Sequence, residues 1–374
     1  MKAIVIAIGS EITSGQITNS NASWISKKLQ DLGVQTPWHL TVPDDFNLIM
    51  EALLFAEKSA DLLFVTGGLG PTSDDFTRDV VAQWAQQEMV YDPKSWDMLS
   101  ERLLSRGYSV KEIQRQQCYF PKNARVLKNF EGTANGFHFK NKNLEVFVLP
   151  GPPREVHSIW HHGITDFLKT FCAHLDKKIT SAWDTLGVGE SDVALMVQEA
   201  LSNFKALQEK VEVGYRVHLP YVEVKVSYNQ SEAEALAPLL SSLDNKLNNI
   251  TITRNGQEII DSFIQKLKSY PQVQITDLAT GSFLSNKLFS RIRKIQQHSK
   301  INFHNYAVNT LDLNQQQLEL TVLSLGKNEV EIRLAKNNQS RKIRLQSPHN
   351  SPLMEERRQQ YFAEMALITW NMWL

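Results

Sequence analysis

Strands and helices alternate over the first 66 residues, and this order constrains the fold more than any other feature of the sequence. Apolar runs at Ala3 to Ile8, Val34 to Val42 and Asp61 to Thr66 predict strands. Apolar residues at helical spacing predict helices at Asn21 to Leu32 and Asp45 to Lys58. Such alternation is typical of a doubly wound, mostly parallel sheet with helices on both faces. We therefore expect an α/β fold that binds its ligand at the carboxyl ends of the strands.

The length and the pattern of segments indicate three domains. At 374 residues, the chain exceeds the roughly 100–200 residues of a typical domain. We expect an N-terminal domain over residues 1–170, a small α+β domain over 171–254 and a C-terminal α/β domain over 255–374. In the middle domain, the alternating segment Tyr221 to Tyr228 predicts a half-exposed strand. Ser231 to Asn248 predicts the helix that packs on it.

The balance of charges limits the kinds of partner. The 40 Lys and Arg residues are matched by 40 Asp and Glu residues, so no overall field attracts nucleic acid or an anionic membrane. No apolar run approaches the roughly 18 residues that span a bilayer. Cys118 and Cys172 belong to no CxxC or Cys/His pattern, which argues against a disulfide framework or structural zinc. We expect a cytoplasmic protein with a small-molecule ligand, no nucleic acid and no membrane partner.

A glycine-rich loop follows the third predicted strand, with the sequence TGGLGPTSDDFTRD from Thr66 to Asp79. Gly67, Gly68 and Gly70 allow backbone angles that are closed to other residues, and they let a phosphate approach the main chain. The amides at the start of the following helix attract an anion. The loop therefore predicts a phosphate cradle.

Two adjacent carboxylates, Asp74 and Asp75, follow these glycines. Like charges beside a phosphate repel unless a divalent cation such as Mg²⁺ lies between them. The pair therefore predicts metal-assisted phosphate chemistry. A simpler interpretation is that Ser73 and the two aspartates only cap the helix that begins near Phe76, although capping does not require three glycines.

Further segments could face the same ligand, and most have a simpler interpretation. Glu11 follows the first strand and would reach the ligand or a metal, or would only cap a turn. Asn21 would cap a helix or contact the ligand. Thr133, in the GTANGF segment, belongs to a second ligand loop or to a plain turn. The rigid stretch Pro150 to Pro153 lacks most amide donors and is expected to shape the pocket wall.

These features together closely resemble the CinA family. The features are GSEITSG (Gly9 to Gly15), Asn21, TGGLGPTSDD, GTANGF and LPGPPRE, and GVGES and EVGY follow them. The TGG-x-G…D-x-T core, Thr66 to Thr77, is also shared with molybdopterin-binding proteins. The resemblance implies a molybdopterin-binding-like first domain similar to a metal-dependent ADP-ribose pyrophosphatase. It further implies a KH-like middle domain, a C-terminal nicotinamide mononucleotide deamidase domain and a homodimer.

The residue patterns and the resemblance together predict roles for individual residues. We expect Asp74, Asp75 and Glu11 to be catalytic, with Asp74 and Asp75 holding the metal. The metal would be Mg²⁺, Mn²⁺ or Co²⁺, with a monovalent cation as a further candidate. The residues implied to bind nucleotide or phosphate are Gly9, Asn21, Thr66, Gly67, Gly68, Gly70, Pro71, Thr72, Thr133, Gly151 and Pro152.

The C-terminal domain departs from the family pattern. The deamidase motif is A-E-S-x-T-G-G with serine as the nucleophile, and the corresponding stretch here is Thr276 to Ser282, in which Leu278 stands at the serine. Leucine has no lone pair with which to attack an amide. The segment HNYAVNTLD keeps Tyr306 without a nearby lysine, and the TG-x-AGP loop is missing before Leu318. We expect a degenerate deamidase site, marked by Leu278, Thr280, Gly281 and Tyr306.

Three hypotheses follow for the function. The first is a metal-dependent hydrolase that cleaves the pyrophosphate of ADP-ribose, or of a related dinucleotide, to AMP and a sugar phosphate. The second is a non-catalytic protein that binds a nucleotide or a pterin. The third, an active nicotinamide mononucleotide deamidase, is disfavoured by Leu278.

Overall fold

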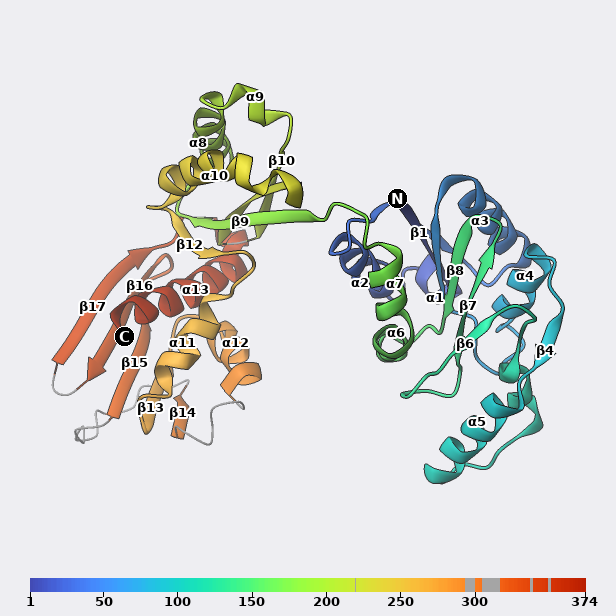
Figure 1. Ribbon diagram of the computed structural model, residues 1–374. Coiled ribbons are helices and arrows are strands. Elements are labelled where there is room, and N and C mark those ends of the chain that lie inside the picture. Colours follow the sequence, from blue (N-terminus) through green and yellow to red (C-terminus); the bar gives the residue numbers. More distant parts are fainter. Residues whose placement is uncertain (219, 293–299, 305–316, 337–338, 349–350) are drawn as a thin grey trace. The chain divides into compact units, whose positions relative to one another are not determined.

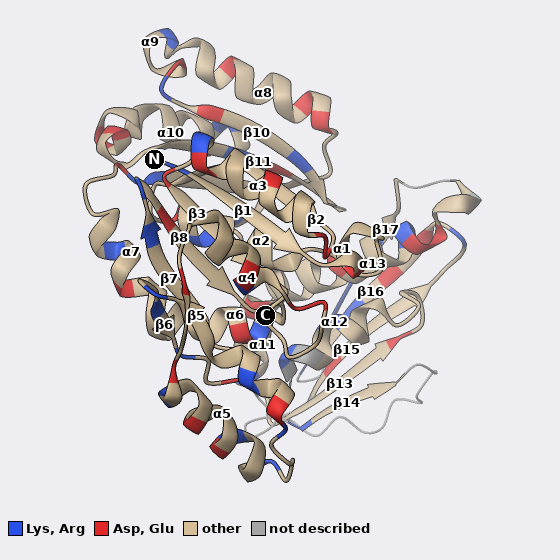
Figure 2. Cartoon of the chain, turned by 90° about the vertical axis from the view of Figure 1, so that its right-hand side faces the viewer, with Lys and Arg blue, Asp and Glu red and all other residues tan. Residues whose placement is uncertain are grey.

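The computed structural model describes the chain except residues 219, 293–299, 305–316, 337–338 and 349–350 (Figure 1). The chain divides into two compact units. The first comprises Met1–Ile179 and Asn229–Ser231, and the second comprises Thr180–Tyr228 and Glu232–Leu374. Basic and acidic residues are interspersed along the elements of both units, as on the helix α5 (Pro93–Ser105) (Figure 2).

The first unit is built on a six-stranded sheet. Its strands are β1 (Lys2–Ile8), β2 (Gln35–Val42), β3 (Leu62–Thr66), β6 (Arg125–Leu127), β7 (Gly136–Asn141) and β8 (Leu144–Leu149). Their order in the sheet is β2-β1-β3-β8-β7-β6. The first four are parallel, and β7 and β6 complete the sheet as antiparallel strands.

Helices cover both faces of this sheet, because successive residues of a buried strand point to opposite sides. Val5 of β1 belongs to the apolar core beneath α2 (Ser20–Gln30), whereas Ile6 belongs to the core beneath α3 (Phe46–Ser59). The expected doubly wound α/β fold is therefore confirmed for this unit (Figure 1).

Shorter elements complete the first unit. They are α1 (Ser10–Thr13), α4 (Thr77–Trp84), β4 (Met89–Tyr91), the 3-10 helix η1 (Glu112–Cys118), β5 (Tyr119–Pro121), α6 (Pro153–Ile159), the π-helix η2 (Trp160–Ile164) and α7 (Thr165–Phe171). β4 and β5 pair in a separate two-stranded sheet.

The second unit contains a four-stranded sheet of order β10-β11-β9-β12. Its elements are β9 (Lys178–Leu186), α8 (Glu190–Ser202), α9 (Lys205–Gln208), β10 (Glu212–His218), β11 (Tyr221–Asn229), η3 (Gln230–Glu232), α10 (Ala233–Leu247) and β12 (Thr251–Arg254). The prediction of a half-exposed strand at Tyr221 to Tyr228 is wrong. β11 is an inner strand, and Tyr221 and Glu223 on one face are buried, as are Val222 and Val224 on the other.

A five-stranded sheet of order β14-β13-β15-β16-β17 lies in the same unit. Its elements are α11 (Ile259–Leu267), β13 (Gln272–Asp277), α12 (Phe283–Ile292), β14 (Lys300–His304), β15 (Gln317–Ser324), β16 (Glu329–Lys336), β17 (Gln339–Gln346), η4 (Pro352–Met354) and α13 (Glu355–Trp373). Within the unit, the Tyr221 hydroxyl of β11 donates to Glu364 Oε2 of α13 at 3.0 Å. The domain boundary expected near residue 254 stays a prediction.

Among the described residues, no helix is long and apolar enough to cross a bilayer.

Candidate functional site

A cavity of about 690 Å³ lies where β1, β3 and β8 end in the first unit. It brings together residues that are far apart in the sequence. The predicted residues that line it are Gly9, Glu11, Asn21, Thr66, Gly67, Gly68, Gly70, Pro71, Asp74, Asp75, Thr133, Gly151 and Pro152. Thr72 lies beside this group but does not line the cavity. The roles assigned to these residues stay predictions.

Two glycines of the loop after β3 allow close contacts that no other residue would permit. Gly67 has φ +107°, and a Cβ there would lie 2.1 Å from the carbonyl oxygen of Ile8. Gly68 has φ +64°, and a Cβ there would lie 2.1 Å from Thr77 Oγ1. The loop therefore packs tightly against β1 and α4 only because these positions lack side chains.

Arg78 holds this loop from the side of α4. Its Nη1 donates to the carbonyl oxygen of Leu69 at 2.7 Å, and its Nη2 donates to that of Gly70 at 3.0 Å. Burial lowers the pKa of the Arg78 guanidinium to about 10, so the side chain stays charged at neutral pH. No sequence signal marked Arg78, because a buried arginine on an amphipathic helix has the same pattern as a solvated one.

The amides of the loop remain available for a ligand. Within the described part of the chain, the backbone N–H groups of Gly68, Leu69 and Gly70 have no hydrogen-bond partner. In a planar trans peptide the carbonyl and the following N–H point in opposite directions. Since the Leu69 carbonyl is turned to Arg78, the Gly70 amide is directed away from it.

The two aspartates do not cap α4, so the simpler interpretation of this segment is wrong. The helix begins at Thr77, and no side chain accepts a hydrogen bond at its N-cap, Phe76. Asp75 Oδ2 instead accepts from the backbone N–H of Thr72 at 2.9 Å. The Thr72 hydroxyl also donates to Asp75 Oδ2 at 2.5 Å. Asp74 is exposed.

Asp44 and Glu155 line the same cavity as Glu11, Asp74 and Asp75. Asp44 follows β2 and accepts from the backbone N–H of Ser10 at 2.8 Å. Among the described lining residues there is no Lys or Arg. Five carboxylates therefore face the cavity without a cationic side chain on its wall.

Glu155 is a half-buried carboxylate of this cavity. It accepts from Asn129 Nδ2 at 2.6 Å, and burial raises the pKa of its carboxyl above the ordinary value. The loop that carries Thr133 is held by the same Asn129, whose Oδ1 accepts from the backbone N–H of Gly132 at 2.9 Å. Glu155 stands in the LPGPPRE segment, but its place in that segment gave no indication that it lines the cavity.

Asn21 is not a helix cap. The cap of α2 is Asn19, whose side chain accepts from the Ala22 backbone N–H at 3.1 Å. Asn21 Nδ2 donates to the carbonyl oxygen of Gly151 at 2.7 Å and so joins α2 to the proline-rich wall.

Comparisons with known proteins agree on one family. The family model described as "Probable molybdopterin binding domain" matches residues 4–170. A competence-damage inducible protein from Clostridium botulinum (strain Langeland / NCTC 10281 / Type F) is 30% identical over 329 residues, which cover 85% of this chain and 78% of the relative. The chain belongs to the CinA, or competence-damage inducible, family.

Further similar proteins include two described as CinA or competence-damage inducible proteins and one described as MoaB. A competence-damage inducible protein from Caldicellulosiruptor saccharolyticus is 28% identical over 297 residues, which cover 77% of this chain and 70% of the relative. A solved structure of CinA from Thermoplasma acidophilum, described as having unknown function, is 30% identical and covers 44% of this chain and 98% of its own, with a TM-score of 0.41. MoaB from Pyrococcus furiosus, a tungsten cofactor synthesizing protein, is 20% identical and covers 45% of this chain and 95% of its own, with a TM-score of 0.31.

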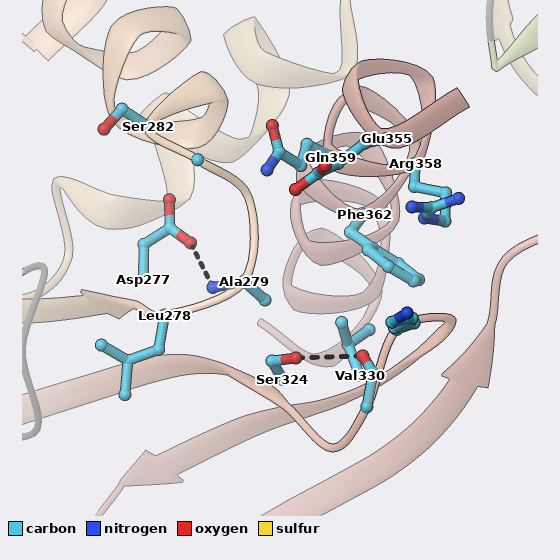
Figure 3. Close-up of a pocket in the computed structure, with 13 residues that line it drawn as sticks. Asp277, Leu278, Ala279, Ser282, Ser324, Val330, Glu355, Arg358, Gln359 and Phe362 are labelled. Carbon is cyan, nitrogen blue, oxygen red and sulfur yellow. Dashed lines mark hydrogen bonds between the residues drawn. The ribbon is translucent and has the colours of Figure 1, made fainter. Parts of the chain in front are cut away.

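A second cavity of the CinA-family chain, of about 600 Å³, lies beside the turn after β13 in the second unit (Figure 3). Leu278 and Gly281 of the predicted degenerate site line it. Thr280 does not, because its backbone N–H and its hydroxyl are turned to Asp277. Tyr306 lies outside the described residues.

Side chains from α13 form the opposite wall of this second cavity, among them Glu355 and Arg358 (Figure 3). Ser282 also lines it and has φ +75°, a value that non-glycine residues rarely adopt. Strain alone does not make it a nucleophile.

Proposed function

We propose that the first unit is a metal-dependent hydrolase that cleaves the pyrophosphate of ADP-ribose, or of a related dinucleotide, to AMP and a sugar phosphate. The observation that supports this is the combination of unpaired loop amides with an acidic, cation-free lining. Amides attract phosphate oxygens, whereas five carboxylates repel them. A divalent cation that accompanies the pyrophosphate would resolve this conflict.

The residues present fit a metal ion that arrives with its substrate. Within the part of the chain that the structure describes, no cluster of three or more His, Cys, Asp or Glu side chains could hold an ion. Mg²⁺ is commonly bound by only one or two carboxylates together with substrate phosphates and water. Asp74 and Asp75 supply such a pair beside the loop amides.

The chain's own groups divide the remaining tasks of the proposed reaction. The amides of Gly68 to Gly70 bind the phosphate oxygens and stabilise the charge that develops on them. Glu155, whose pKa burial moves toward neutrality, is suited to accept a proton from the attacking water. A divalent ion, when bound, would neutralise the pyrophosphate and lower the pKa of a bound water.

A non-catalytic binder of a nucleotide or pterin is the second candidate. It is favoured by the match to the molybdopterin-binding family model, because that match specifies binding and no reaction. In either case we propose that the C-terminal deamidase-like domain is inactive, since Leu278 stands where the family has its nucleophile.

One screen tests these proposals. The purified chain is incubated with ADP-ribose, flavin dinucleotide or nicotinamide mononucleotide, each with Mg²⁺, Mn²⁺ or Co²⁺, and the products are separated. We expect AMP from a dinucleotide only when a metal is present. Tight binding without AMP from either dinucleotide would favour the non-catalytic binder.

A further inference from the structure

Two side-chain oxygens of the first unit's cavity are buried without a hydrogen-bond partner. They are Oδ1 of Asn21 and Oε1 of Gln117, and both residues line the cavity. Asn21 is 8% exposed and Gln117 is 2% exposed. A buried polar atom without a partner is uncommon in a folded protein and is costly to keep. Two in one cavity point to a missing partner.

The orientation of both amides is fixed by their other contacts. Asn21 Nδ2 donates to the carbonyl oxygen of Gly151 at 2.7 Å, and Gln117 Nε2 donates to that of Leu69 at 3.2 Å. A backbone carbonyl can only accept, so the nitrogen of each side-chain amide must face it. Each amide oxygen is therefore on the other side and can act only as an acceptor.

Phosphate cannot satisfy these oxygens. A phosphate at neutral pH offers only acceptors to them, as do the carboxylates of the cavity. An amide oxygen is satisfied by an O–H or N–H group of a ligand, by water or by a divalent cation. In AMP the groups that can donate to them are the sugar hydroxyls and the amino group of the base.

We propose that Asn21 and Gln117 form an acceptor pair that recognises neutral hydrogen-bond donors of the nucleotide, while the loop amides bind its phosphate. The choice of a nucleotide as ligand rests on the proposed function. A ligand that lacks these donors would leave both oxygens unpaired and would bind weakly.

The glycine loop supplies a matched control for Gln117. The neighbouring Gln116 also donates to this loop, from Nε2 to the carbonyl oxygen of Thr72 at 3.1 Å, but it does not line the cavity. Arg78 still holds the Leu69 carbonyl when Gln117 is replaced. Gln117→Met and Gln116→Met therefore remove comparable loop contacts, and only the first removes a cavity acceptor.

Calorimetry with AMP, 2′-deoxy-AMP, 3′-deoxy-AMP and IMP, each with Mg²⁺, tests the proposal without requiring turnover. We expect the unmodified chain to prefer AMP to at least one of these analogues by about tenfold. Weaker binding of a deoxy analogue than of AMP would identify a sugar hydroxyl as the donor, and weaker binding of IMP would identify the base amino group. Gln117→Met should weaken AMP binding about tenfold and should abolish the preference, whereas Gln116→Met should preserve it.

Asn21→Leu provides an independent second variant, and the thermal midpoint of each variant monitors folding. Equal affinities of the unmodified chain for all four nucleotides, or no binding of AMP, would overturn the proposal. If Gln117→Met and Gln116→Met bound AMP with equal affinity and kept the same preference over the analogues, the proposal would be overturned as well. Failure to hydrolyse ADP-ribose, with the AMP preference intact, would refute the hydrolase and leave the acceptor pair standing.

Discussion

The Arg78 guanidinium lies 2.7 Å from the carbonyl oxygen of Leu69, although nine residues separate the two along the chain. This contact turns the carbonyl side of the glycine loop toward α4 and leaves the amide side for a ligand. The phosphate cradle therefore depends on a buried cation outside the cavity lining as well as on its glycines.

Replacing Arg78 should disorganise the loop. Arg78→Met removes two charge-assisted hydrogen bonds and leaves two carbonyls with fewer partners. We expect the free energy of unfolding to fall by about 3 kcal/mol and nucleotide binding to be lost. Urea denaturation and calorimetry measure both effects. Arg154→Met is the control, because Arg154 is exposed and does not line the cavity; equal unfolding of the two variants would contradict this role.

Replacing Asp75 should remove metal-dependent cleavage and keep the fold. In Asp75→Asn the side chain can still accept from the Thr72 backbone N–H, but its charge is gone. We expect turnover of ADP-ribose to fall about 100-fold or more with each metal. Asp79→Asn, an exposed neighbour outside the cavity, should keep full turnover. Near-normal turnover in Asp75→Asn would exclude the metal pair.

Glu155 should make the first unit sensitive to pH. Burial raises the pKa of its carboxyl, so its contribution to stability is fully present below the ordinary pKa and is lost as the pH rises through the raised value. Glu155→Gln stays neutral, so its thermal midpoint should exceed that of the unmodified chain at about pH 8 and match it at about pH 4. The exposed Glu131→Gln should show no such trend. If the thermal midpoints of Glu155→Gln and of the unmodified chain differed by the same amount at every pH, the effect of burial on Glu155 would be ruled out.

Much of the site could be predicted from the sequence, because its key residues are contiguous. The glycines and Asp74 and Asp75 stand in one loop, whose conformation follows from local rules. Arg78 and Gln117 could not be identified, because their importance comes from contacts with a loop that precedes them by 9 and 48 residues. Burial of Tyr221 and Glu223 could not be predicted for a similar reason, since alternation does not reveal whether both faces of a strand are covered.

The full chain should form a dimer in solution. This expectation comes from the family resemblance and from the amphipathic helices of a C-terminal domain that we propose to be inactive. Light scattering at micromolar concentration should give twice the chain mass. A monomeric mass over the whole concentration range would contradict it and would weaken the idea that the domain was kept for assembly.

The C-terminal domain should not release ammonia from nicotinamide mononucleotide. Acyl transfer needs an activated nucleophile, and we expect Leu278, which lines the second cavity, to stand at the family's serine position. Binding and charge stabilisation without a nucleophile leave only a small part of the usual acceleration. Leu278→Ser should also stay inactive, because the segment around Tyr306 has no lysine and the TG-x-AGP loop is missing. A coupled assay measures the rate of ammonia release by the unmodified chain and by Leu278→Ser, with an active deamidase of the family as the positive control. Release by the unmodified chain at about 1 s⁻¹ or faster would place a working nucleophile elsewhere in the domain.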